Sequence, residues 1–189
     1  VGNNNITLNK LAAGQSVKLG SNLDLDQATV ILSIADTSSS AIADSLAITT
    51  DVNNSTATGT LEGITAQYVA DVSVDLGSTA AANTTIAGGA LNFADATNVT
   101  LTGSKITSAT VTAKDDATID ATGVTGVTEL TVDTSNDYTV KGSATAKTTF
   151  VMSTGLDADD VIVGGAATTD TLTATVDSLT ATTGALSIS

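Results

Sequence analysis

The stretch NVTLTGSKITSATVTAKDDATIDATG, residues 98–123, alternates apolar residues with small polar ones. Its apolar positions include Val99, Leu101, Val111 and Ile119, and Thr, Ser or Asp fills most positions between them. A period of two, rich in Val, Ile and Thr, is typical of half-buried β-strands. Gly, Asn and Asp recur every few residues, which indicates turns. The stretch therefore predicts short strands separated by tight turns.

The same alternation continues through the segments TELTVDT, DYTVKG and TTFVMS. The apolar residues at the strand centres recur about every ten residues, as expected when one short strand and one turn repeat along a solenoid. These residues are Leu101, Val111, Ile119, Leu130, Val140, Phe150, Ile162 and Leu172. We expect them to face inward.

The fold class predicted is all-β, with a parallel β-solenoid of the β-helix or β-roll type over residues 85–175. Its core residues are small, which suits a thin stacked solenoid. The alternative, an immunoglobulin-like sandwich, usually contains larger core residues and a Trp. Residues 1–84 are expected to form a less regular, β-rich N-terminal part. We expect residues 176–189 to begin a further repeat unit. The sequence near residues 80–90, where the two parts meet, has no Pro- or Gly-rich linker.

Composition excludes several classes of function. The 189-residue chain carries 20 acidic residues against 6 basic ones, a net charge of −14, which repels nucleic-acid backbones and suits divalent cations. It contains no His and no Cys, so the common acid–base, thiol and zinc chemistries are missing. No apolar run is long enough to span a membrane. The chain opens on Val1, so we expect a fragment or a processed product.

One internal match suggests a longer repeat. The segments at residues 43–61 and 169–186 align with Asp44 on Asp170 and Leu46 on Leu172, at a common offset of 126. If the match is structural, Asp44 and Asp170 begin equivalent strands. The parent protein would then be a tandem array in which stacked units cover each other's ends.

The order of these segments resembles a known family. A DSL…TTD strand is followed by TLEGIT, by ladders such as NVTLTGS, and by a Gly/Asp-rich stretch that ends in DTLTA. This pattern resembles the surface-layer and large repetitive surface proteins of Gram-negative bacteria, which carry calcium-binding glycine–aspartate repeats. The resemblance covers most of residues 43–189. It implies secretion, folding outside the cell in calcium, and assembly into a lattice.

The Gly/Asp-rich stretch GLDADDVIVGGAATTDTLTA, residues 155–174, is the candidate metal site. The calcium β-roll repeat reads G-G-x-G-x-D-x-U-x, where U is a large apolar residue. Two damaged copies fit it, one around Asp160 and one around Asp170. The alternative is a solvated turn without metal. The residues predicted to bind calcium are Asp157, Asp159, Asp160, Gly164, Gly165 and Asp170.

We therefore expect a non-enzymatic, extracellular structural protein at the bacterial cell surface, a module of a self-assembling surface layer. The alternative is a stalk module of a large secreted, calcium-dependent adhesin. An enzyme such as a polysaccharide lyase on a β-helix ranks lower, because its groove usually contains basic residues and Arg is absent here. Expected partners are other copies of the chain, in a lattice or filament, and a cell-surface polysaccharide. Nucleic acid is not expected.

Overall fold

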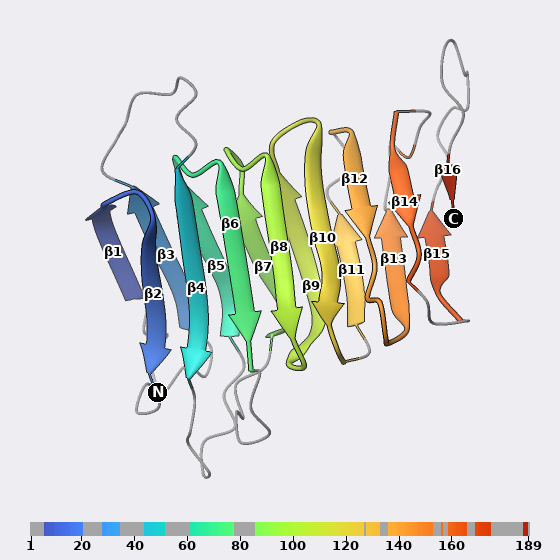
Figure 1. The fold of residues 1–189 in the computed structure, drawn as a ribbon, viewed down its shortest axis with the longest axis horizontal. Helices are drawn as coiled ribbons and strands as arrows, with labels where there is room; N and C mark the ends of the chain where they lie inside the picture. Colours follow the sequence, from blue (N-terminus) through green and yellow to red (C-terminus); the bar gives the residue numbers. More distant parts are fainter. Residues whose placement is uncertain are drawn as a thin grey trace.

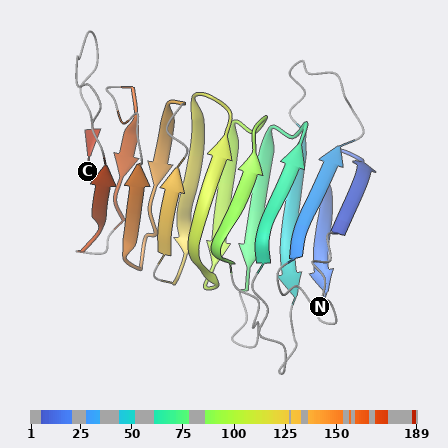
Figure 2. The same ribbon diagram turned by 180° about the vertical axis from the view of Figure 1, so that it is seen from behind.

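The computed structural model describes residues 6–20, 28–34, 44–51, 61–77, 86–126, 128–132, 136–152, 156, 159–165, 169–174 and 187–188. These residues form strands and turns and contain no helix. The strands lie in two facing layers, and the chain alternates between the layers as it advances along the long axis (Figure 1). The view from behind shows the second layer with the same order of strands (Figure 2).

In the described part of the chain, each layer is a sheet of eight strands. The odd sheet contains β1 (Ile6–Leu11), β3 (Ala28–Ile34), β5 (Leu61–Gln67), β7 (Ile86–Phe93), β9 (Ile106–Ala113), β11 (Thr128–Val132), β13 (Thr148–Met152) and β15 (Thr171–Ala174). The even sheet contains β2 (Gln15–Gly20), β4 (Ser45–Asp51), β6 (Asp71–Leu76), β8 (Asn98–Gly103), β10 (Ala117–Val124), β12 (Tyr138–Lys141), β14 (Val161–Val163) and β16 (Ser187–Ile188).

Every pairing within these sheets is parallel, for example β10 with β8 and β11 with β13. One odd strand and the following even strand make one coil, and each coil stacks on the coil before it. The prediction of an all-β parallel solenoid is confirmed. The antiparallel sandwich that was its alternative does not occur in the described strands.

The coil length follows from the strand register. Val99 pairs with Ile119, Ile119 with Val140 and Val140 with Ile162. Each of these coils therefore advances the chain by roughly 20 residues, and half of a coil is one strand and one turn. The sequence spacing of about ten residues corresponds to successive strands on opposite walls of the solenoid.

Apolar side chains form continuous columns inside the solenoid. In the even sheet one column runs from Val72 through Val99, Ile119 and Val140 to Ile162, and each of these residues is at most 2% exposed. Columns of the odd sheet face it and include Ile64, Leu91, Val111, Leu130 and Phe150, also at most 2% exposed. The predicted inward residues are confirmed as core, and Leu172 packs partly buried against it.

Two large aromatic side chains, Tyr138 and Phe150, are buried in the core next to residues that accommodate them. Tyr138 is 1% exposed, and its hydroxyl donates to the Ala113 carbonyl at 3.1 Å and accepts from the Asn136 amide at 3.2 Å. The ring of Phe150 lies over Gly142, where an added Cβ would stand 2.7 Å from the ring. A glycine at that position is therefore needed for the ring to fit.

The N-terminal part joins the same two sheets. Across residue 84, β5 pairs with β7 and β6 pairs with β8. Its coils are longer, because Val30 pairs with Ile64 and Val72 with Val99, partners that lie further apart in the sequence than those of the later coils. Extra residues between strands explain why the sequence there lacks a regular spacing.

The match at an offset of 126 is not a structural repeat. Leu46 lies in β4 of the even sheet, whereas Leu172 lies in β15 of the odd sheet. The expectation that Asp44 and Asp170 begin equivalent strands is wrong. Asp44 corresponds instead to Asp160, because each directly precedes a strand of the even sheet. Because Ala, Thr and Asp recur near the starts of strands in both sheets, segments of opposite sheets can match in sequence without being structurally equivalent.

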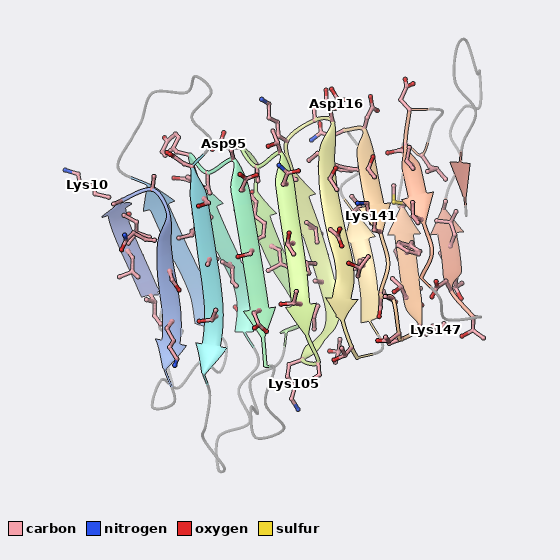
Figure 3. All side chains as sticks on the ribbon, in the orientation of Figure 1. Lys10, Asp95, Lys105, Asp116, Lys141 and Lys147 are labelled. Carbon is pink, nitrogen blue, oxygen red and sulfur yellow. The ribbon has the colours of Figure 1, made fainter. Side chains whose placement is uncertain are left out.

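The solenoid has two edges where the chain crosses between sheets. We call the odd-to-even crossings the upper edge; its described residues are 12–14, 44, 68–70, 94–97, 114–116, 136–137, 156 and 159–160. The even-to-odd crossings form the lower edge, with described residues 77, 104–105, 125–126, 142–147, 164–165 and 169–170. Figure 3 shows Asp95 and Asp116 on the upper edge, and Lys105 and Lys147 on the lower edge.

We predict that Leu101→Ala destabilises the fold by about 2–5 kcal/mol, because it leaves a cavity in a fully buried column. The neighbouring Thr100 points outward and is exposed, so Thr100→Ala is the matched control and changes stability by about 0.5 kcal/mol or less. Urea unfolding followed by circular dichroism measures both variants. Equal effects of the two changes would contradict the inward and outward assignment.

Candidate functional site

Among the described residues that were predicted to bind calcium, Asp160 is the most buried. It directly precedes β14 on the upper edge and is 2% exposed. Its Oδ1 accepts a hydrogen bond of 2.9 Å from the backbone N–H of Tyr138, the first residue of β12. β12 is the neighbouring even strand, so this carboxylate connects two successive coils. A buried carboxylate needs such donors, since leaving its charge unpaired would be costly.

Asp170 plays a similar part on the lower edge. Its Oδ1 accepts from the backbone N–H of Thr148 at 2.8 Å, and its Oδ2 accepts from that of Gly165 at 2.7 Å. Thr148 is the first residue of β13, the strand that pairs with β15. At Gly165 an added Cβ would stand 1.5 Å from the Ser143 carbonyl oxygen. Only glycine allows the two coils to approach this closely.

The structure separates the predicted metal ligands into two groups. Asp159 and Asp160 lie on the upper edge, whereas Gly164, Gly165 and Asp170 lie on the lower edge, with β14 between the groups. The four residue steps from Asp160 to Gly164 span roughly 13 Å of extended chain. Two ligands of one calcium ion lie within roughly 5 Å of each other, because each oxygen is about 2.3–2.6 Å from the ion. One ion cannot bind both groups.

The other acidic residues in the described part of the chain do not complete a cluster of metal-binding carboxylates at either edge. Asp157 lies outside the described residues. Within the described part of the chain, no three Asp or Glu side chains gather closely enough to hold a metal ion. The six residues do not fit one shared calcium centre. Binding of calcium at either edge alone, with oxygens from neighbouring coils, stays a prediction.

The same use of aspartate occurs at two further turns of the upper edge. Asp95 Oδ2 accepts from the backbone N–H of Tyr68 at 2.9 Å, and Asp115 Oδ1 accepts from that of Asp137 at 3.0 Å. The partners are 27 and 22 residues apart, which is one coil in each region. The sequence predicted a turn around Asp115 but not this bridging. The available signal was an aspartate one coil length away from a turn residue that precedes an even strand.

Asp120 forms an ion pair with Lys141 on the outer face of the even sheet. Its Oδ1 accepts from the Thr122 hydroxyl at 2.6 Å and from the Thr122 backbone N–H at 3.0 Å, and its Oδ2 lies 3.5 Å from Lys141 Nζ. Partial burial raises the pKa of the Asp120 carboxyl, but the Thr122 hydrogen bonds and the Lys141 charge together lower it below its ordinary value of 3.8. The ionised form is therefore favoured in the folded chain.

Comparisons with other proteins give no family for this arrangement. The sequence matches no family model, and neither a curated protein nor a solved structure matches it. Among the described residues, no helix is long and apolar enough to cross a membrane. The geometry of the coils and their turns is therefore the basis for a functional proposal.

We predict that Asp160→Ala destabilises the fold by about 1–3 kcal/mol, because the buried N–H of Tyr138 loses its acceptor. Asp160→Asn keeps an oxygen acceptor and should cost less. Chemical unfolding in calcium-free buffer measures both variants. If the Ala and Asn variants are equally stable, the hydrogen bond to Tyr138 contributes nothing and the bridging role is wrong.

A second prediction concerns pH. Because the pKa of Asp120 is lowered in the folded chain, its ionised form contributes stability above pH 3.8, and this contribution is lost as the pH falls through the lower folded value. Asp120→Asn should therefore lose less stability than the wild-type chain in strong acid. Urea unfolding from about pH 6 to about pH 2.5 tests this. Parallel curves for the two proteins would contradict the lowered pKa.

Proposed function

We propose that the chain is a non-catalytic structural module of a bacterial extracellular surface layer or array, built to associate with further copies of itself. The observation that carries this proposal is the solenoid. Its coils add along one axis through parallel backbone pairing, and its core continues from coil to coil. Repeating folds of this kind depend on neighbouring units to cover their ends.

The ends of the described sheets support association along the axis. β1 and β2 are the outermost described strands at one end, and β15 and β16 are the outermost at the other (Figure 1). The outer side of a terminal strand presents backbone N–H and C=O groups that a further parallel strand can pair with. A second copy therefore offers the same kind of surface that each coil already uses.

Surface charge gives calcium a role in this proposal. The net charge of −14 opposes close approach of identical copies and also opposes the compact state. Aspartates of four successive coils follow one another along the upper edge: Asp95, Asp115, Asp137 and Asp160. We propose that calcium bound along these edges lowers the repulsion between copies. The resemblance to calcium-dependent surface proteins supports the same choice of ion and the extracellular location.

The second candidate is a stalk module of a secreted adhesin. The seven steps between eight strands, at about 4.8 Å each, give the stack a length of roughly 34 Å. A stack that grows in one direction can also hold a binding domain away from a cell. Such a module does not need to associate sideways with its copies.

We predict that the purified chain forms ordered sheets or filaments in millimolar calcium and stays dispersed in sodium of matched ionic strength. Negative-stain electron microscopy distinguishes these states. Sodium controls for screening, which weakens repulsion without binding at a site. Single particles at every calcium concentration would reject the array and favour the stalk module.

The melting temperature in the same two buffers reports whether calcium binds the folded chain. A ligand that binds only the folded state stabilises by about 2.7 kcal/mol at a hundredfold excess over its Kd. Asp160→Asn and Asp170→Asn each remove one carboxylate, from the upper and the lower edge respectively. If both variants keep the full calcium shift, the ion does not bind at either predicted position.

A further inference from the structure

Tyr68 differs from the other aromatic residues of the chain. The chain contains two Tyr, two Phe and no Trp. Phe93, Tyr138 and Phe150 are at most 2% exposed, whereas Tyr68 is 41% exposed. An isolated exposed ring needs no explanation by itself, because soluble proteins expose many apolar atoms. Its backbone and its surroundings provide the further evidence.

The backbone at Tyr68 is in the left-handed region, with φ of 63°. Bulky residues rarely adopt this conformation, and Gly or Asn would adopt it more easily. The Asp95 carboxylate holds it by accepting the Tyr68 N–H at 2.9 Å. The neighbouring Ala66 and Val69 are each 2% exposed and face the core. The turn therefore places the tyrosine at the surface while the chain on both sides stays anchored, and strain of this kind is often associated with a functional position.

A groove of about 300 Å³ adjoins the ring at the upper edge, between the coils that contain β5 and β7. We call it the Tyr68 groove; Thr65, Ala66, Gln67, Tyr68, Asn92, Ala94 and Asp95 line it. Gln67, Asn92 and Asp95 are exposed and bring amide and carboxylate groups to the same space as the ring. Its position at the upper edge can be followed from the labelled Asp95 in Figure 3.

We infer that the Tyr68 groove binds a neutral polysaccharide. A sugar ring has an apolar C–H face, which can pack on the tyrosine, and a rim of hydroxyls, which can hydrogen-bond to amides and carboxylates. The groove is at the small end of ligand sites, about 300–1,000 Å³, so it takes a short stretch of a longer chain. Gln67 and Asn92 can each donate to and accept from hydroxyls, and the Asp95 carboxylate accepts from them.

The negative charge of the groove and of the whole chain favours neutral over acidic polysaccharides. Asp95 contributes a carboxylate to the groove, and the whole chain carries a net charge of −14. Both repel uronic-acid and sulfated chains. The described lining contains no Lys that could pair with an acidic sugar. This inference does not depend on lattice assembly, since the groove is formed within a single chain.

The test is affinity electrophoresis of the full chain in native gels that contain dextran, mannan or galactan, with alginate as the anionic comparison. We expect at least one neutral polysaccharide to retard the wild-type chain, and alginate not to. Tyr68→Gly should weaken that binding by about tenfold or more, as removal of a central aromatic contact does. Tyr68→Phe keeps the ring and should retain binding.

The melting temperature of Tyr68→Gly and two further variants, Leu8→Ala and Asp95→Asn, distinguish a loss of binding from a loss of folding. Tyr68→Gly relieves the left-handed backbone, so its melting temperature should equal or exceed that of the wild-type chain while binding is lost. Leu8→Ala is the matched control, because Leu8 is a comparably exposed apolar residue, 37% exposed, in β1. Asp95→Asn should weaken binding while keeping an oxygen acceptor for the Tyr68 N–H. The inference is overturned if no neutral polysaccharide retards the chain, if alginate binds equally, or if Tyr68→Gly binds as well as Leu8→Ala.

Discussion

Parallel pairing of each coil with the one before it is the constraint on which the structure depends. A parallel neighbour must start at the same edge and run in the same direction, so the chain has to cross to the opposite sheet and return within each coil. The later coils do this with two short strands and two turns apiece. The in-register stacking then aligns Val99, Ile119 and Val140 into one apolar column, so the same geometry creates the core.

The edges pose a different physical problem, because backbone groups at the turns lie outside the regular ladder. Aspartate solves it at several positions by accepting a backbone N–H one coil away, as Asp160 does from Tyr138 and Asp170 from Thr148. Close approach adds a second requirement, which Gly165 meets by lacking a Cβ next to Ser143. The glycine and aspartate content that resembles a calcium repeat thus has an identified structural role at these turns. This role is compatible with calcium binding but does not require it.

The two proposals place different functions on different parts of one solenoid. Association with further copies uses the ends of the sheets, where β1, β2, β15 and β16 are the outermost described strands. Polysaccharide binding uses the upper edge, where a longer coil brings Asp95 into contact with Tyr68. A surface module that stacks through its ends leaves its edges accessible to ligands.

The sequence alone predicted a parallel β-solenoid over residues 85–175 and its inward residues, since a period of two and a spacing of about ten follow from strand and coil geometry. That the solenoid also includes the strands before residue 85 was decided by the tertiary structure. The sequence also predicted turns at Asp115, Asp160 and Asp170. Only the tertiary structure decided which turns share an edge. Asp160 and Asp170 are close in sequence yet lie on opposite edges, whereas Tyr68 and Asp95 are 27 residues apart and in contact. The repeat expected at an offset of 126 failed for the same reason, because a linear match does not record which wall of the solenoid a strand occupies. Neighbours across coils depend on the length of every intervening turn, and local composition does not specify that length.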